Sequence, residues 1–288
     1  MQNNYGATQI KKEIEEHFEW IYNNRLQKLV ELEIAKQEEH GRVSCIGING
    51  ETYLAPQWSE LSHICQQEHI VQKHFQGFTE ILPVPMALGL KQKFAAYRKQ
   101  VQTLNSGDTI LDSDKKFGSW LNTDIDGELL YFPNSYNDQH GSITKDQWLT
   151  DNKTSSGWQI VLIEPRVSIQ WRFPAMTNGR QALPNLITPN NLLKLIKTNQ
   201  DYIGEQAIDL DTYLIFSMLV YPGVILDDSS SLFGSTSLLL GNCLLGQKQV
   251  LAGCWARQNK SDRFFSISSW DVDSASGNAT TRMVVRIA

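Results

Sequence analysis

The side chains in this chain best suited to metal or redox chemistry are its four cysteines. These are Cys45, Cys65, Cys243 and Cys254. No two of them have CxxC spacing, and no histidine is close enough in sequence to complete a zinc pattern. Paired cysteines such as Cys243 and Cys254 can bind copper or carry redox chemistry, but no histidine or lysine stands beside either one. We therefore expect buried, reduced thiols and no metal site.

Three histidines provide the nearest approach to a metal-binding spacing. His63, His69 and His74 fall within a segment predicted to be one helix. On a helix, His63 and His74 would share a face but lie about 16 Å apart, too far to hold one ion. We expect these side chains to be exposed or to cap the helix.

Alternating acids at Asp124, Asp126 and Glu128 suggest a short calcium loop. An EF-hand needs a bidentate glutamate at its twelfth position, and that position is Ser135 here. The plainer interpretation is that Asp126 and Gly127 form the turn of a hairpin.

Asp227 and Asp228 are a second acidic pair, which could perform acid–base chemistry if one carboxyl were buried. The three serines that follow favour a solvated turn instead. The sequence also lacks GxSxG, Walker, GxGxxG and HExxH motifs. We therefore predict no catalytic residues and no cofactor, and we expect a protein that is not an enzyme.

Composition restricts the classes of partner. The chain has 288 residues, 41% of them apolar, which is enough to bury a large core. It has 26 basic and 31 acidic residues, so a basic footprint for nucleic acid is absent. The most apolar stretch, residues 213–226, is broken by Ser217, Pro222 and Gly223 and is shorter than the ~20 residues of a membrane span. The first residues lack the features of a signal peptide, so we expect a cytoplasmic protein without membrane insertion.

The first quarter of the sequence predicts helices around one hairpin. Residues 9–39 form a long amphipathic pattern in which Ile10, Ile14, Phe18 and Ile21 recur at helical spacing. Thr8 is the expected N-cap, and Gly41 the expected stop. A hairpin then turns at Asn49–Gly50 between strands 43–48 and 51–54, because both positions of such a turn need positive φ. A helix over 56–75, an extended stretch over 79–90 and a helix over 91–104 follow.

The rest of the chain mixes strands with two further helices. Strands are expected at 128–133 and 158–165, the second as a central strand because it is almost continuously apolar. Residues 105–122 and 134–156 are polar loops, and 171–186 is irregular. Helices cover 188–198, capped by Thr188 with Pro189, and 210–220, capped by Asp209. The tail is β-rich, with strands at 237–240, 250–255, 264–269 and 282–287.

Several segments, taken in order, resemble an uncharacterised family of bacterial proteins with a C-terminal C-type-lectin-like domain. The resemblance is carried by residues 78–85, 128–133, 157–164, 204–206, 209–219, 227–228, 253–255 and 282–287. That fold is shared with formylglycine-generating enzymes and with the variable proteins of diversity-generating retroelements. The resemblance implies an α+β protein with two parts: a helical region with a β-hairpin at 1–76, and a C-type-lectin-like domain with inserted loops at 77–288.

What the resemblance implies is a display surface for a ligand or protein partner, because the final residues of this fold present side chains from a fixed β-scaffold. The predicted binding residues are Trp255, Arg257, Asn259, Arg263, Trp270, Asp271 and Asn278. Tryptophan and arginine are the types that dominate binding energies, although Trp270 could equally be a core residue. The cysteine spacing does not match the enzymatic members. The mild composition of residues 275–283 suggests a scaffold that is no longer diversified.

A second hypothesis keeps the same fold but moves the partner contact. The chain would then be a structural or adaptor subunit of a bacterial assembly, such as a secretion coupling complex, and would dock through its N-terminal helix. The partner is expected to be a protein in both cases.

Overall fold

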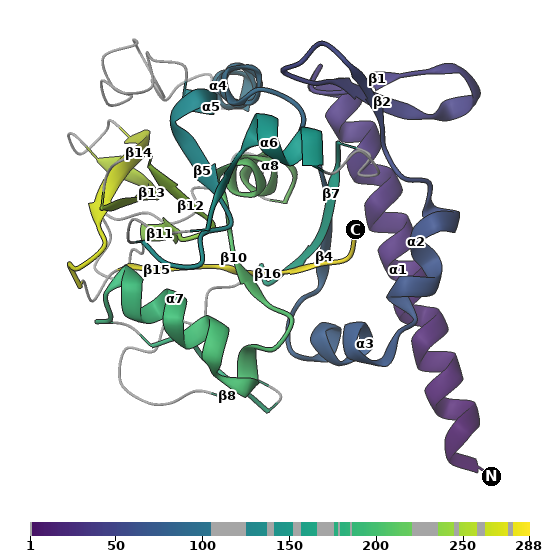
Figure 1. Cartoon of the computed structure of the whole chain (residues 1–288). Helices are drawn as coiled ribbons and strands as arrows, with labels where there is room; N and C mark the ends of the chain where they lie inside the picture. The colour runs from purple at the N-terminus through teal and green to yellow at the C-terminus, as the bar shows by residue number, and fades with distance from the viewer. Residues whose placement is uncertain are drawn as a thin grey trace.

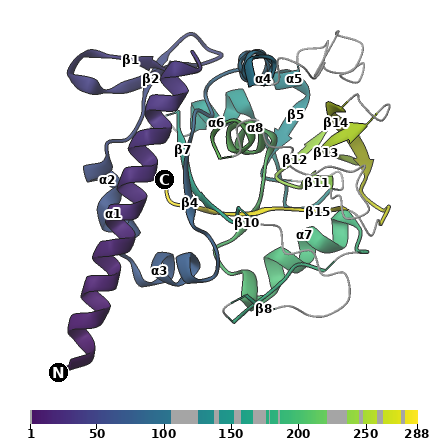
Figure 2. The ribbon, with the colours of Figure 1, turned by 180° about the vertical axis from the view of Figure 1, so that it is seen from behind.

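A computed structural model of the chain describes residues 2–104, 125–136, 141–151, 157–165, 176–177, 179–184, 186–220, 236–244, 248–257, 263–275 and 279–288. Helices and several small, mainly antiparallel sheets are mixed along the sequence (Figures 1 and 2). The expectation of an α+β protein is therefore met. None of the helices in these ranges combines the length and apolar character of a membrane span.

The N-terminal helix α1, Gln2–Glu31, runs along one side of the molecule, and its first turns project beyond α3 in both views (Figures 1 and 2). Its buried stripe contains Ile14, Phe18 and Ile21, as the helical spacing predicts, but Ile10 of the predicted stripe is exposed. Both predicted ends were wrong: the helix begins before Thr8 and stops well before residue 39. Glu33 adopts φ 60°, and the next two amides both donate to the carbonyl of Leu29, which reverses the chain.

The chain after α1 forms a three-stranded sheet in the order β1-β2-β3, from Lys36–Gln37, Val43–Ile46 and Thr52–Leu54. A short 3₁₀ turn, η1, Glu39–Gly41, joins the first two strands. The predicted hairpin is confirmed, but its two-residue turn was wrong. Ile46 pairs with Thr52, so the connection is longer, and only Gly50 of the expected turn pair has positive φ, 80°. The amide of Gly47 closes the loop on the carbonyl of Glu51 at 2.8 Å.

The single helix predicted over 56–75 is two helices, α2, Trp58–Cys65, and α3, Glu68–Phe75. Gln67 stands between them with extended backbone angles, φ −65° and ψ 140°, and acts as the N-cap of α3. His63 therefore lies on α2, whereas His69 and His74 lie on α3. The predicted shared helix face of His63 and His74 was wrong for this reason.

The central sheet has the strand order β10-β16-β7-β4. It joins Gln206–Ala207, Met283–Arg286, Gln159–Ile163 and Glu80–Val84. Strand β7 is paired on both sides, with Leu162 opposite Ile81 on one edge and Val285 on the other, and all five of its residues are buried. The predicted central strand is confirmed. Strand β4 contacts both α1 and α8, Leu210–Leu219, and lies between them in both views (Figures 1 and 2).

The remaining elements pack beside that sheet. One sheet, β12-β5-β6, joins Asn242–Leu244, Leu129–Tyr131 and Ile143–Thr144, and another, β14-β13-β11-β15, joins Arg263–Asp271, Gln249–Arg257, Thr236–Leu239 and Ala279–Thr280. The helices in this part are α4, Leu90–Leu104; α5, Ile125–Glu128; α6, Lys145–Asp151; and α7, Pro189–Thr198, which is followed by the 3₁₀ turn η3, Gln200–Tyr202. Two short strands, β8, Met176–Thr177, and β9, Arg180–Gln181, pair with each other.

Local capping signals were reliable in this half of the chain. Thr188 Oγ1 accepts from the Asn191 amide at 3.3 Å, and Asp209 Oδ1 accepts from the Thr212 amide at 2.8 Å, so α7 and α8 begin where predicted. Other expectations were wrong. Asp126 and Gly127 lie in the single helical turn α5 instead of a hairpin turn, and β6 and α6 fall inside a segment predicted to be a loop.

The buried apolar side chains form one continuous cluster from Ile14 in α1 to Val285 in β16. The N-terminal helices and the later sheets therefore share a core. Within it, α8 is buried along almost its whole length, which makes it the element around which the others pack.

We predict that Glu33→Gly is more stable than Glu33→Ala by about 1 kcal/mol, measured by urea unfolding. Both variants lose the exposed ion pair with Lys99, 2.9 Å long, but only glycine relieves the left-handed backbone penalty. As a control, Glu31→Gly in the last turn of α1 should lose stability, because glycine disfavours helix. Equal stability of the two Glu33 variants would contradict a left-handed backbone conformation at Glu33.

Candidate functional site

The predicted binding residues of the C-terminal third lie mainly on one long hairpin. Trp255 and Arg257 belong to β13, and Arg263, Trp270 and Asp271 belong to β14. The register pairs Arg257 with Arg263 at one end and Val250 with Trp270 at the other. Seven residues of extended chain separate these pairs, a distance of about 23 Å. The structure therefore divides the predicted surface between the two ends of the hairpin.

At the end of the hairpin where β13 connects to β14, most side chains lie outside the part of the chain that the structure describes. Asn259 and Asn278 lie outside the described residues, as do the side chains of Trp255, Arg257 and Arg263. What is established for these three is their strand position and register. Trp255 pairs with Phe265, two residues from the Arg257–Arg263 pair, so the three predicted positions adjoin one another on the hairpin.

The opposite end of the hairpin is described in full. Trp270 is half-buried, and its Nε1 donates to the carbonyl of Ser274 at 3.0 Å. Asp271 is exposed, and its Oδ1 accepts from the amide of Asp273 at 2.7 Å. Asn190, in the first turn of α7, donates to Asp273 Oδ1 at 2.7 Å. Trp270 and Asp271 thus shape a turn that is held against the start of α7.

The hairpin rests on the buried helix α8. Val250, Leu251 and Ala252 of β13 are fully buried. Gly253 lies so close to α8 that a Cβ atom there would come within 2.5 Å of Tyr213 Cε1. The absence of a side chain at Gly253 lets β13 approach the helix, which fixes the position of the hairpin.

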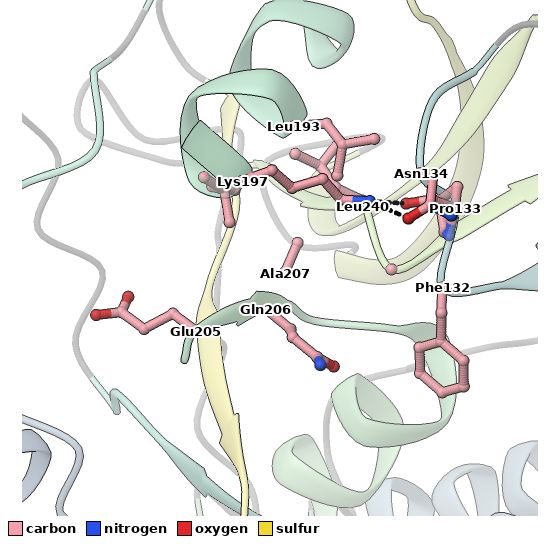
Figure 3. A pocket seen from close by; sticks show the side chains of 11 residues that line it. Phe132, Pro133, Asn134, Leu193, Lys197, Glu205, Gln206, Ala207 and Leu240 are labelled. Atoms are coloured by element: carbon pink, nitrogen blue, oxygen red, sulfur yellow. Dashed lines mark hydrogen bonds between the residues drawn. The ribbon is translucent and has the colours of Figure 1, made fainter. Parts of the chain in front are cut away.

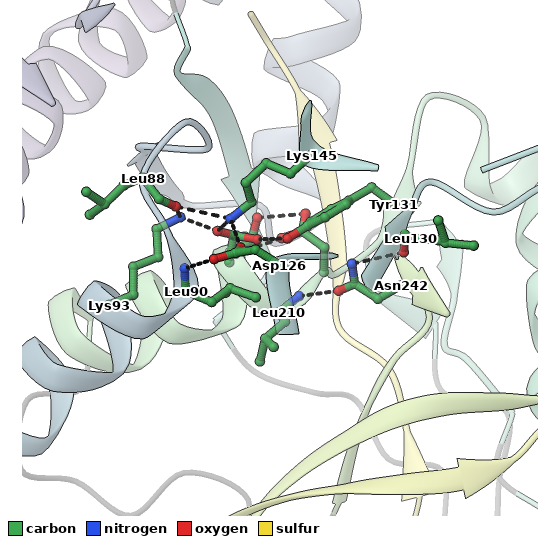
Figure 4. A network of polar contacts seen from close by, with 12 residues as sticks. Leu88, Leu90, Lys93, Asp126, Leu130, Tyr131, Lys145, Leu210 and Asn242 are labelled. Carbon is green, nitrogen blue, oxygen red and sulfur yellow. Dashed lines mark hydrogen bonds and ion pairs between the residues drawn. The ribbon is translucent and has the colours of Figure 1, made fainter. Parts of the chain in front are cut away.

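Asp211 of α8 is the centre of a buried network of charges. Figure 4 shows the side chains of Lys93, Lys145, Asp126 and Tyr131 converging in this network. Lys145 Nζ donates to Asp211 Oδ1 at 3.0 Å and pairs with Asp126 Oδ1 at 2.8 Å. Lys93 Nζ also pairs with Asp211 Oδ1, and both ammonium groups donate to the carbonyl of Leu88, each at 3.1 Å. Tyr131 Oη donates to the second carboxylate oxygen of Asp211 at 2.7 Å.

Burial and neighbouring charges act in opposite directions on the pKa values of this network. Burial alone would raise the pKa of Asp211, but Lys145 and Lys93 outweigh it and hold that pKa below its ordinary value. Burial likewise acts to lower the pKa of Lys145, yet Asp211 and Asp126 raise it overall. Burial does lower the pKa of Lys93. Two lysines and two aspartates therefore balance one another.

The same network is closed to solvent. The side chains of Lys93, Lys145 and Asp211 have exposed fractions of 0%, 1% and 0%. A lysine with a lowered pKa is a known kind of nucleophile, but one without access cannot reach a substrate. The network therefore fastens α4, α5, α6 and α8 together. Sequence reasoning missed it, and the only local signal was an aspartate inside an otherwise apolar helix.

A second buried cluster joins the N-terminal helices to the later sheets. Arg180 of β9 donates through Nε and Nη2 to the two carboxylate oxygens of Glu205, at 2.8 and 2.6 Å. Lys73 of α3 donates to Glu205 Oε1 at 2.6 Å, and Arg180 Nη1 donates to Glu164 at 3.2 Å. The Arg180 guanidinium also stacks on the Phe78 ring, 5.1 Å from its centroid. Two cations again face two carboxylates.

The other residues considered for chemistry do not converge. The described cysteines Cys45, Cys65 and Cys243 are buried and unpaired, as predicted, and burial raises the pKa of Cys45 to about 12. Asp124, Asp227, Asp228 and the side chain of Cys254 lie outside the described residues. Within the described ranges, no group of three His, Cys, Asp or Glu residues is placed to hold a metal ion.

We predict that Asp211→Asn lowers the free energy of unfolding by about 3–5 kcal/mol, because it leaves two ammonium groups buried without a carboxylate between them. Adding Lys93→Met to that variant should restore part of the loss, which a double-mutant cycle by urea unfolding would measure. Lys28→Met is the matched control, since its pair with Glu31 is exposed and should contribute less than about 1 kcal/mol. Additive effects of Asp211→Asn and Lys93→Met would rule out the coupling.

We also predict that Gly253→Val destabilises the protein by about 1–3 kcal/mol, because the added side chain overlaps Tyr213 and forces β13 off α8. Gly127→Ala is the control, since a Cβ atom there meets open space. Thermal unfolding followed by circular dichroism would measure both. A Gly253→Val protein as stable as the control would show that β13 does not need this close approach.

Comparison of the chain with protein-family models, with curated proteins and with solved structures found no match.

Proposed function

We propose that this chain is a non-catalytic binding protein that displays a surface for a protein partner on a C-type-lectin-like scaffold, related to the variable proteins of diversity-generating retroelements. The observation that carries the proposal is the hairpin β13–β14. It has nine paired positions and places Trp255, Arg257 and Arg263 beside one another at its far end. Aromatic and arginine side chains on a rigid support are typical of binding hot spots.

Two further observations support this proposal. The middle of β13 is anchored on α8 through the close approach of Gly253 to Tyr213, and the network around Asp211 fixes α8 in turn. A fixed scaffold reduces the entropy lost when a partner binds. The charged clusters described above are enclosed and balanced, so they favour a structural role over catalysis. We propose a cytoplasmic location and no nucleic acid partner, given the net charge of −5.

A second candidate function is supported by the surface of α1. Trp20 is 67% exposed and Ile10 is 43% exposed, although the residues between them at the core-facing positions are buried. Tryptophan is one of the residue types that contribute most to binding energy at protein interfaces. The chain would then be an adaptor or structural subunit of a bacterial assembly, such as a secretion coupling complex, that docks through α1.

Point variants can separate the two candidates, whereas deletion of α1 cannot. Phe18 and Tyr22 of α1 are fully buried, so removing the helix would expose the core. The exposed positions Trp20 and Ile10 can be changed without touching it.

We predict that Arg257→Ala with Asn259→Ala abolishes capture of a partner from cells, whereas Trp20→Ala with Ile10→Ser does not. Capture would be measured by quantitative mass spectrometry after affinity purification, with equal stability of both variants checked by thermal unfolding. The reverse pattern would favour the adaptor candidate. A partner retained by both variants would overturn both proposals.

A further inference from the structure

A small pocket lies apart from the hairpin, between α7 and the central sheet (Figure 3). Its volume is about 160 Å³, similar to a cavity that holds benzene. One wall comes from α7, one from the start of β10, and the others from the bend at Phe132–Asn134 and the turn at Leu240–Gly241. Segments from four parts of the sequence therefore enclose a space of small-molecule size.

The walls of this pocket combine apolar and polar surface, and the apolar side chains are firmly positioned. Leu193, Ile196 and Leu240 are buried side chains of the core. The turn at Gly241 packs directly on β10, since a Cβ atom there would lie 2.8 Å from the carbonyl of Ala207. The body of a ligand would thus meet preformed hydrocarbon surface, which favours binding without rearrangement.

One side of the pocket is held in a strained conformation. Phe132 adopts φ 58°, a left-handed conformation that is unusual for an aromatic residue. Its amide donates to the carbonyl of Gly241 at 2.8 Å, and the guanidinium of Arg286 lies 4.5 Å from its ring centroid. Strain that the surrounding structure maintains is concentrated at ligand sites in proteins.

The ammonium of Lys197, which lines the pocket, contacts no carboxylate of the described residues. Lys197 Nζ donates to the carbonyl of Pro133 at 2.8 Å and to Asn134 Oδ1 at 2.7 Å, and both acceptors are neutral. Lys197 forms no ion pair with any carboxylate of the described residues. Lys197 is an exposed residue at the rim of the pocket, and partial burial of its ammonium lowers the pKa of that group.

The one acid that lines the pocket does not neutralise this ammonium. The Glu205 carboxylate is fully buried and already bound by Arg180 and Lys73. Figure 3 shows it pointing away from the ammonium of Lys197, which reaches toward Asn134 and Pro133. Among the residues that line the pocket, Lys197 therefore carries the one charge that no carboxylate of the described residues neutralises.

We propose that this pocket binds a small organic monocarboxylate, with its carboxylate on Lys197 and its short apolar or aromatic body against Leu193, Ile196 and Leu240. A single ammonium balances one negative charge, which fits a carboxylate better than a doubly charged phosphate. The apolar walls and the volume favour a body about the size of an aromatic ring. This site is independent of the proposed partner surface.

Titration of the full chain with sodium benzoate, followed by ¹H–¹⁵N NMR at constant ionic strength, tests the proposal. The amides of Ala207, Gly241 and Phe132 should shift in a saturable manner. Benzamide, a neutral molecule of the same shape, should bind about tenfold or more weakly, because it cannot form the charge-assisted contact. Absence of saturable shifts at these amides, or equal affinity for benzamide, would overturn the proposal.

Three variants assign the binding to this pocket. Lys197→Met keeps the aliphatic stem and should weaken benzoate about tenfold or more while leaving benzamide unchanged. Lys194→Met on the exposed face of α7 is the matched control and should leave benzoate affinity unchanged. Benzoate affinity that survives Lys197→Met, or falls equally in Lys194→Met, would locate the binding elsewhere. Ala207→Leu fills the pocket and, in a folded protein, should abolish the shifts.

Discussion

The carboxylate of Asp211 is the point on which the arrangement of this protein depends. It is fully buried, and it can remain charged there only because Lys93, Lys145 and Tyr131 all donate to it. Those three residues belong to α4, α6 and β5, which are far apart in the sequence. A displacement of any of these elements would leave a charge uncompensated in the core, so the network admits only one relative placement of them.

The same carboxylate links the core to the surface of the C-terminal third. Asp211 and Tyr213 lie on one helix, α8, and Tyr213 supports β13 where Gly253 allows close approach. The charged network thus fixes α8, and α8 fixes the hairpin. The cluster of Arg180, Glu205 and Lys73 performs a similar task between α3 and the sheet strand β10. Both clusters keep their charged groups enclosed in the core.

Much of the fold could be predicted where a few adjacent residues decide the local energy. The caps Thr188 and Asp209, the apolar run of β7 and the Asn49–Gly50 hairpin are signals of this kind. The errors occurred where distant contacts outweighed local preference. The amphipathic pattern continues past Glu31, yet the chain turns at Glu33 because residues 36–37 pair with β2. Similarly, Gln66 and Gln67 carry no strong breaking signal, and the split between α2 and α3 follows from packing against α1. For the candidate sites, the sequence indicated the hairpin positions but neither charged cluster nor the pocket.

By itself, the sequence determined the mixture of helices and strands, the buried central strand, the buried cysteines of the described residues and the starts of α7 and α8. These follow from periodicity and from hydrogen bonds between residues a few places apart. Only the tertiary structure decided that Lys93, Lys145 and Asp211 meet in the core, and that Trp270 and Arg257 stand at opposite ends of one hairpin. It also decided that Lys197 lines a pocket whose one carboxylate, that of Glu205, is already bound by Arg180 and Lys73. Charge compensation depends on distances between segments that are remote in the chain, and residue spacing carries no information about such distances.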